Sequence, residues 1–278
     1  MKLHFYGTGA SEGVPAIFCE CAYCKKIRAL GGKNYRLRTC AQVDENLLID
    51  FSMDSHAQTL FRGLDLSAID HLLVTHSHED HLFPLGLMQI KPPMAYYDRA
   101  RHLHVYGNET VMGKIREMAE NFNPDGEILR DYLGLQPVSP FEAFSVGEYR
   151  VTAFPANHDK REDCLIYVIC REGKTLLYGH DSAMFSEETW EGLKKFRFDC
   201  VVLDCTMVEK TGIFDGHMGL PDNIKVRQRM LAGGMADERT IFIATHFVHS
   251  QNPVHERITP IFAEQGFLAA YDGMEVEF

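Results

Sequence analysis

The feature that most constrains this chain is a cluster of potential metal ligands that directly follows an apolar run. Leu72-Leu73-Val74 predicts a buried strand, and residues 82–90 predict the helix that it feeds. Between them stands the hexad His76-Ser77-His78-Glu79-Asp80-His81. Its H-x-H-x-D-H positions offer three imidazoles and one carboxylate, whose nitrogen and oxygen atoms outnumber the four ligand atoms of one tetrahedral ion, while Ser77 and Glu79 are assigned to neither metal. The hexad therefore predicts two metal ions at a strand-to-helix turn, one facing His76 and His78 and the other facing Asp80 and His81.

Length and charge narrow the range of functions. The chain has 278 residues, of which 45% are hydrophobic, and this is enough to bury a full core. No repeat or proline-rich linker divides it, so we expect a single domain spanning 1–278. A formal net charge of -11 disfavours a nucleic-acid partner. A small anionic substrate stays compatible with this charge, because a local metal site overrides the global field.

The N-terminal residues show no basic-then-apolar signal segment. No apolar stretch approaches the roughly 18 residues that a membrane span needs. We therefore expect a cytoplasmic protein with no membrane partner, whose eight cysteines are reduced, metal-bound or buried rather than disulfide-bonded. The sequence does not give the oligomeric state, and a homodimer stays open.

A second ligand cluster lies near the N-terminus, where Cys19, Cys21 and Cys24 follow the spacing C-x-C-x-x-C. Three thiols this close in a reducing compartment predict a structural zinc, which needs a fourth ligand from elsewhere. Cys40 is near in sequence, whereas His217 lies far away in a glycine-rich segment. The residues alone leave both candidates open.

The rest of the chain alternates between strand and helix patterns. Strands are expected at residues 46–51, 69–75 and 102–106, and again at 151–154, 165–170, 175–178, 201–203, 240–244 and 267–271. Helices are expected at residues 108–121, 186–195 and 223–231. Two groups of strands separated by helices predict an α/β fold with two mixed sheets face to face and helices outside. The less regular segment 126–140 is expected to be an insertion over the site.

Three of the later strands end in a potential ligand. His158, Asp181 and His246 each follow an expected strand by a few residues. A rigid scaffold displays functional side chains at such positions. Together with the hexad, these three residues complete two coordination shells.

The hexad, followed by histidine, aspartate and histidine at later strand ends, resembles the metallo-β-lactamase superfamily over nearly the whole chain. The resemblance implies an αββα sandwich and a dinuclear site. In that site His76, His78 and His158 would hold one metal, Asp80, His81 and His246 would hold the other, and Asp181 would bridge them. The hexad is specific for the fold but not for the substrate.

A narrower resemblance rests on Gly7-Thr8-Gly9, the cysteine cluster, Leu48-Ile49-Asp50 and Asp272-Gly273-Met274-Glu275. These segments resemble the phosphodiesterase branch, in particular the phosphoribosyl cyclic phosphodiesterases of bacterial phosphonate (carbon-phosphorus lyase) metabolism. That family holds a structural zinc with three cysteines and a distant histidine, which by position implies His217. The sequence departs from the family at Met207, where a histidine is expected, and this leaves the exact substrate open.

The implied activity is hydrolysis of a small, cyclic, ribosyl or nucleotide-like phosphate ester by a metal-bound hydroxide. Zinc, manganese and iron all suit the ligand set. Asp80 at the second metal and His249 are the expected catalytic residues. His249 follows His246 by three residues and is expected to protonate the leaving group. Asp50 is expected to orient a metal-bound histidine, and His180 to be a neighbour of the site rather than a ligand.

Two other functions share these features. A ribonuclease Z-like RNA endonuclease would carry the same hexad, although the negative charge disfavours it. A non-catalytic accessory protein of cofactor biosynthesis with the same fold is expected to lack one or more ligands, and no ligand is missing from this sequence.

Overall fold

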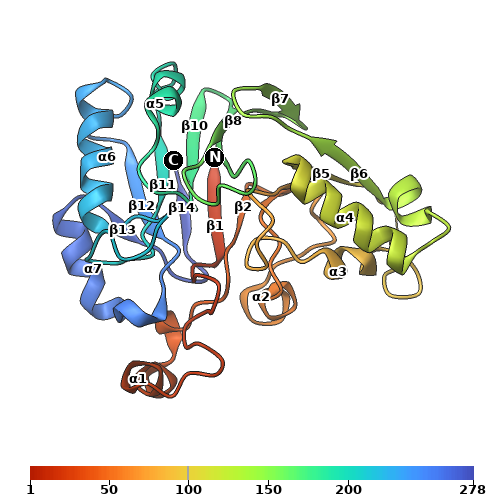
Figure 1. Ribbon diagram of the computed structural model, residues 1–278, viewed down its shortest axis with the longest axis horizontal. Helices are drawn as coiled ribbons and strands as arrows, with labels where there is room; N and C mark the ends of the chain where they lie inside the picture. The colour runs from red at the N-terminus through yellow and green to blue at the C-terminus, as the bar shows by residue number, and fades with distance from the viewer. Residues whose placement is uncertain (99) are drawn as a thin grey trace.

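The computed structural model describes all residues except residue 99. Its described residues form two seven-stranded sheets that pack face to face, with helices on their outer sides (Figure 1). The strand order is β14-β1-β2-β3-β4-β5-β6 in the first sheet and β13-β12-β11-β10-β9-β8-β7 in the second. This arrangement confirms the expected α/β sandwich.

The first sheet contains β1 (Lys2–Gly7), β2 (Cys40–Val43), β3 (Leu47–Ile49), β4 (His71–Leu73), β5 (Leu103–Gly107), β6 (Leu133–Pro137) and β14 (Glu275–Glu277). The second contains β7 (Ala143–Val146), β8 (Tyr149–Pro155), β9 (Leu165–Arg171), β10 (Lys174–Gly179), β11 (Cys200–Asp204), β12 (Ile241–Thr245) and β13 (Leu268–Ala269). Both sheets are mixed, because β3 to β6 and β10 to β13 run parallel while their remaining neighbours are antiparallel.

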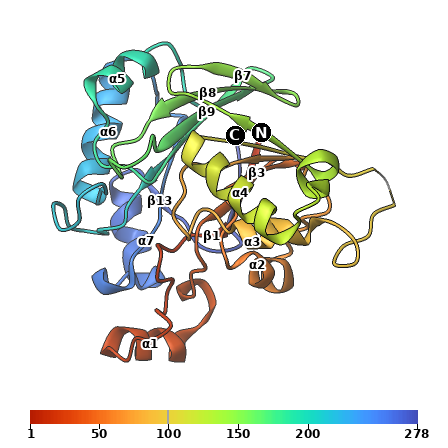
Figure 2. The ribbon, with the colours of Figure 1, turned by 45° about the vertical axis from the view of Figure 1, so that its right-hand side comes forward.

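The helices are α1 (Ala22–Leu30), α2 (Ser55–Arg62), α3 (Pro84–Leu87), α4 (Glu109–Phe122), α5 (Glu187–Leu193), α6 (Leu220–Ala232) and α7 (His255–Glu264). Helices α2, α3 and α4 lie beside the first sheet and α5, α6 and α7 beside the second (Figure 1). Helix α1 projects from one end of the sandwich, as the turned view in Figure 2 also shows. No helix among the described residues is long and apolar enough to span a membrane.

The parallel strands are apolar on both faces because both faces are covered. In β3, Leu47 and Ile49 lie in the core between the sheets, whereas Leu48 packs under the helices. In β4, Leu73 faces the other sheet and Leu72 faces the helices. Burial on both sides holds these strands rigidly, so the loops at their carboxyl ends start from fixed points.

Two expectations from the sequence were wrong. The segment 126–140 is not an insertion over the site, because a π-helical turn, η3 (Ile128–Tyr132), leads into β6, which pairs in parallel with β5. Ile128 and Leu133 are buried in the helix-facing core and draw the segment onto the sheet edge. The helix expected at residues 82–90 is split into the short α3 and a 3₁₀ turn, η2 (Met88–Ile90).

Candidate metal centre

The first group of candidate ligands is His76, His78 and His158, which can each place one ring nitrogen within 4.8 Å of the others. His76 and His78 come from the turn after β4, and His158 follows β8. The Nε2 atom of His158 lies 3.3 Å from Nδ1 of His78. The Nε2 atom of His76 is buried and makes no hydrogen bond to any described residue. A buried nitrogen without a partner is costly, and a metal ion at this point would provide one.

The second group is Asp80, His81, Asp181 and His246, all buried and all within the same mutual distance. The Nε2 atom of His81 lies 3.2 Å from Oδ2 of Asp181, and Nε2 of His246 lies 3.3 Å from Oδ2 of Asp80. The Nε2 atom of His81, like that of His76, makes no hydrogen bond to a described residue. The donor set of histidine nitrogens and carboxylate oxygens suits zinc, manganese or iron.

Asp181 faces both groups. Its Oδ2 atom lies 3.7 Å from Nε2 of His158 and 4.0 Å from Nε2 of His76, in addition to its contact with His81. One carboxylate therefore stands between the two sets of ligands. This geometry fits two neighbouring cations with Asp181 as the bridging ligand.

The buried aspartates and histidines of the centre shift one another's pKa values, and the aspartates favour their ionised form. Burial by itself would raise the pKa of Asp181, but the attraction of His246 and His81 outweighs it and holds that pKa well below the usual range. Burial would also lower the pKa of His81, yet Asp50, Asp80 and Asp181 outweigh it and raise that pKa. The pKa of His76 is instead lowered, first by burial and then by the neighbouring His81. Buried carboxylates that stay ionised make the site attractive to cations.

Asp50 orients His81, as the sequence predicted for a carboxylate that supports a metal-bound histidine. Its Oδ2 atom accepts a hydrogen bond from Nδ1 of His81 at 2.8 Å, and its Oδ1 atom accepts one from the Thr75 backbone N–H at 2.8 Å. Donation from Nδ1 leaves Nε2 of His81 for the metal. Both Asp50 and His81 are completely buried.

Other supporting residues were missed by the sequence analysis. Glu162 accepts hydrogen bonds from the backbone N–H and the hydroxyl of Ser77, at 3.1 and 2.7 Å, and thereby holds the hexad turn. Asp159 lies 3.0 Å from Nε2 of His78, so that Nδ1 of that ring faces the first group. Both carboxylates lie in the loop that carries His158. The loop contains several acidic and basic residues, and nothing in its sequence distinguished Asp159 and Glu162 from the others.

His217 lies at the metal centre and not with the cysteines, so its assignment as a structural zinc ligand was wrong. Its Nδ1 atom lies 2.8 Å from Oδ2 of Asp204, and its ring is 4.8 Å from that of His158. Asp204 also accepts a hydrogen bond from the Met218 backbone N–H at 2.9 Å. This bond folds the loop after β11 back over the strand end and carries His217 inward. The sequence did offer one indication of this site, because Asp204 stands at the end of a buried strand, β11, as the other candidate ligands do.

The electrostatics of His217 follow from Asp204. Burial would lower the pKa of His217, but the charge and the hydrogen bond of Asp204 outweigh it, and the pKa is raised. Asp204 and His217 can also place ligand atoms within 4.8 Å of those of Asp181 and His246. The pair therefore adds an imidazole that readily holds a proton to the edge of the metal centre.

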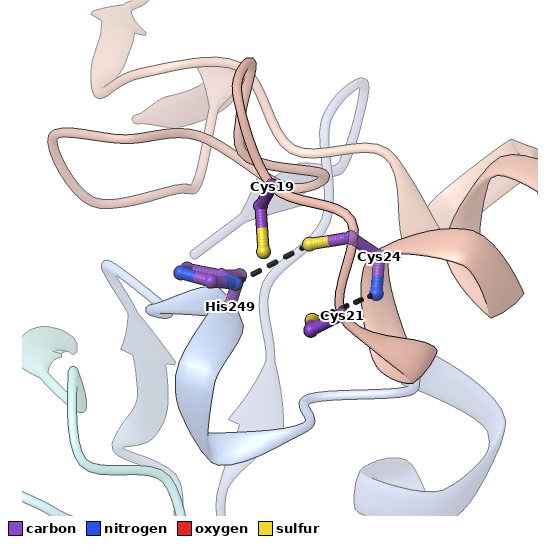
Figure 3. A group of neighbouring side chains, drawn as sticks. All are labelled: Cys19, Cys21, Cys24 and His249. Carbon is purple, nitrogen blue, oxygen red and sulfur yellow. Dashed lines mark hydrogen bonds between the residues drawn. The ribbon is translucent and has the colours of Figure 1, made fainter.

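His249 lies with the cysteines, so its assignment as the proton donor at the metal centre was also wrong. It begins the 3₁₀ turn η4 (His249–Gln251), and its Nδ1 atom is 3.3 Å from Sγ of Cys24 (Figure 3). His246 has a φ of 64°, a left-handed conformation that turns the chain away from the metal centre. The ring of His249 therefore points toward helix α1 instead of following His246.

Cys19, Cys21, Cys24 and His249 form a third group whose ligand atoms all lie within 4.8 Å of one another. Figure 3 shows the three sulfur atoms and the imidazole facing a common point. The Cys24 backbone N–H donates to Sγ of Cys21 and, as the first cause, lowers the pKa of Cys21 to about 6. All three cysteines are free thiols. Three thiols and one imidazole are a donor set typical of structural zinc.

Met207 and His180 complete the comparison with the sequence. Met207 is buried and its sulfur accepts a hydrogen bond from the Ile213 backbone N–H at 3.1 Å, so it supports the loop that carries His217. His180 is also buried, with its ring 5.6 Å from that of His246. It is a neighbour of the centre, as expected, and belongs to none of the ligand groups found among the described residues.

Known structures share this fold across the full chain. The zinc-bound PqqB from Methylobacterium extorquens superposes with a TM-score of 0.77 at 20% identity and covers 100% of both chains. A diphosphatase of the PhnP family superposes with a TM-score of 0.70 at 24% identity, over 100% of this chain and 97% of that one. The short form of human tRNase Z gives a TM-score of 0.69 at 16% identity, over 100% and 99% of the two chains.

Curated relatives match only part of the chain. An octanoyltransferase of Porphyromonas gingivalis is 30% identical over 169 residues, which are 58% of this chain and 31% of that protein. A ribonuclease Z of Picosynechococcus is 30% identical over 159 residues, which are 57% of this chain and 44% of that protein. The matched region thus spans between about a third and a half of the length of these relatives.

A sequence model of a protein family assigns the chain to its superfamily. The model described as "Beta-lactamase superfamily domain" matches residues 45–247. This range includes every candidate ligand of the two neighbouring groups. The chain therefore belongs to the beta-lactamase superfamily, and its fold brings a cluster of histidine and aspartate side chains together within the matched region.

Proposed function

We propose that this protein is a dinuclear metal-dependent phosphodiesterase that hydrolyses a small ribosyl or nucleotide-like phosphate ester, including cyclic ones. The observation that carries the proposal is the position of Asp181 between two complete ligand groups. When bound there, two divalent cations supply an activated water and neutralise charge on the phosphate oxygens. The names of the PhnP-family diphosphatase and of tRNase Z both denote cleavage at phosphorus, which supports the same chemistry here.

His76, His78 and His158 would hold one cation, and Asp80, His81 and His246 the other, with Asp181 shared. Asp50 and Asp159 fix which nitrogen of His81 and His78 faces the cations. This support matters because a histidine binds metal only through a deprotonated ring nitrogen.

The leaving alkoxide needs a proton, and His217 is the residue placed to hold it. Its Nδ1 atom is engaged by Asp204 at 2.8 Å, which leaves Nε2 as the nitrogen that can carry a proton for the leaving oxygen. Asp204 raises the pKa of His217 and so favours its protonated form, as a proton donor requires. We therefore transfer to His217 the role that the sequence analysis gave to His249.

We also propose a structural zinc on Cys19, Cys21, Cys24 and His249. The four side chains face one point: Cys24 lies in α1, Cys19 and Cys21 lie in the loop just before it, and His249 lies in the turn after β12. A zinc ion there would tie the projecting N-terminal segment to the second sheet.

Ribonuclease Z-like cleavage of RNA is a second candidate, because several curated relatives carry the name ribonuclease Z. The net charge of -11 opposes it, since RNA binding depends on basic surfaces. A non-catalytic accessory role is less consistent with the structure, because every ligand expected for a dinuclear site is brought together.

The test is a substrate screen on purified protein with measured metal content. We expect turnover of bis-nitrophenyl phosphate and of cyclic ribosyl phosphates, and none of a precursor tRNA. Asp181→Ala and His78→Ala should abolish turnover while melting remains cooperative, since both residues lie on loops outside the core. Exposed His56 on α2 offers a matched control as His56→Gln, which should stay active.

Each alternative outcome has a clear meaning. Cleavage of precursor tRNA without turnover of small diesters would refute the proposal and support ribonuclease Z-like cleavage of RNA instead. Full turnover in Asp181→Ala with unchanged metal content would refute the assignment of the metal centre.

A further inference from the structure

Three histidines gather on the first sheet at the end opposite the metal centre. His71 begins β4 and His104 lies in β5, and these two residues are direct partners across the parallel pair. His102 precedes His104 by two residues and therefore projects from the same face. The ring centroids of His71 and His104 are 5.5 Å apart, and those of His102 and His104 are 4.8 Å apart.

The position of this group separates it from the catalytic site. Two residues further along each strand, Leu73 and Tyr106 lie in the core between the sheets. The three imidazoles thus face the same side as that core but stand at the amino ends of β4 and β5. The hexad follows the carboxyl end of β4, so the length of the strand lies between the two sites.

Glycines surround the rings and leave them room. A Cβ atom at Gly134, the β6 partner of His104, would lie 2.8 Å from Nε2 of His102 and 3.1 Å from Nδ1 of His104. A Cβ atom at Gly147 would lie 2.8 Å from Nε2 of His71. The nitrogens of all three rings are therefore bordered by positions that carry no side chain. His102 and His104 are exposed and can rotate about their side-chain bonds.

Two of the three rings, those of His71 and His102, favour the neutral form that binds a metal. Burial and then the neighbouring His104 lower the pKa of both His71 and His102. Neutral imidazoles at neutral pH have a lone pair free for a cation. The hydroxyl of Tyr106 lies 3.5 Å from Nδ1 of His71, on the side away from Gly147.

We propose that His71, His102 and His104 form a further binding site for a divalent cation with affinity for imidazole, such as Zn²⁺, Ni²⁺ or Cu²⁺. His102 and His104 lie two residues apart along the chain, and His71 is the partner of His104 on the neighbouring strand. The three side chains therefore form a triangle on one face of the sheet. Nitrogens bound to one such ion lie about 2.0–2.1 Å from it. The three rings do not form one of the close ligand groups found among the described residues as they stand, so binding requires the exposed rings of His102 and His104 to turn toward His71. Three ligands leave a coordination position for water. A bound cation would link β4 to β5.

Nickel is a suitable probe once the other sites hold zinc. The zinc-loaded full-length protein is desalted and dialysed against micromolar Ni²⁺, and both metals are measured per chain. The variants are His102→Gln/His104→Gln and His71→Gln, with His56→Gln as a control for an exposed histidine outside the group. Zinc content, melting temperature and hydrolytic turnover are recorded for each, because none of these should change.

The wild type and His56→Gln should each take up one Ni²⁺ per chain. The double variant should lose this uptake, and His71→Gln should weaken it at least ~10-fold. Equal nickel uptake by the double variant and the wild type would overturn the proposal. Unchanged nickel affinity in His71→Gln would also overturn the proposal, because only the exposed residues His102 and His104 would then bind the ion. Displacement of zinc in equal amount would show that nickel enters the other sites instead.

Discussion

The Nδ1 atom of His217 lies 2.8 Å from the Asp204 carboxylate, at the edge of the ligand cluster that contains Asp181 and His246. These two residues come from the end of β11 and from the loop that folds back over it. The pair holds the His217 imidazole in one orientation at the edge of the candidate metal centre. The proton-donor role that we propose for His217 therefore depends on this contact.

We expect His217→Gln to lower turnover of a ribosyl or alkyl phosphodiester by about 10² to 10⁴. The reason is that a poor leaving group needs the proton, whereas a nitrophenolate departs without it. Turnover of a nitrophenyl ester should therefore fall much less. Asp204→Asn should show the same dependence on the leaving group. Equal losses on both esters would assign His217 a binding role only.

His249→Ala provides the contrast for that experiment. Its ring faces Cys24, so the ratio of turnover on the two esters should equal that of the wild type. A selective loss on the ribosyl ester would return the proton donor to His249.

Asp50→Asn should lower metal affinity or activity by roughly 10- to 100-fold. The carboxylate accepts the Nδ1 hydrogen of His81 at 2.8 Å, and an amide supports that orientation less well. Metal retained after dialysis against a weak chelator measures the effect. Asp65→Asn, at an exposed carboxylate, is the matched control. Wild-type metal retention in Asp50→Asn would show that His81 is held by packing alone.

Cys24→Ser should remove one zinc per chain and lower the melting temperature, while activity remains in the fraction that stays folded. The cause is loss of a thiolate from the group that joins α1 to the turn after β12. X-ray absorption on the wild type should show sulfur at about 2.3 Å from zinc. Cys170→Ser, at a half-buried cysteine on β9, serves as the control. Unchanged zinc content in Cys24→Ser would contradict the structural zinc.

His255 should make stability depend on pH below neutrality. Burial, followed by the charges of Arg36 and Lys33, lowers its pKa from 6.5 to about 4. The folded protein thus binds this proton less readily than the unfolded chain. Its contribution to stability is complete above pH 6.5 and is lost as the pH falls toward 4.

The difference should amount to about 1 kcal/mol after allowance for solvent screening. His255→Gln should therefore flatten the curve of unfolding free energy against pH in this interval. Denaturant melts at several pH values measure it. The N–H of residue 255 donates to Asn34 in either case, so the start of α7 is preserved. An equally steep curve in His255→Gln would assign the pH dependence to other groups.

Local order along the chain was enough to predict which side chains the structure groups as candidate metal ligands. The hexad and the C-x-C-x-x-C cluster each lie within six consecutive residues, so the backbone holds their side chains close whatever the rest of the chain does. His158, Asp181 and His246 were also predictable, because each follows a strongly apolar strand. The alternation of strands and helices likewise predicted the two-sheet sandwich.

Local sequence could not show which of His217 and His249 lies with the cysteines and which lies at the candidate metal centre. Both lie in loops after parallel strands, and their direction depends on backbone contacts made in the folded state. The N–H of Met218 binds Asp204 and brings His217 inward, whereas the left-handed φ of His246 sends His249 toward Cys24. The edge strand β6 was missed for a similar reason, since its pairing with β5 depends on burial of Ile128 and Leu133. Sequence alone thus determined which residues could bind metal, and only the tertiary structure decided which loop faces which site, because loop direction is set by contacts between distant segments.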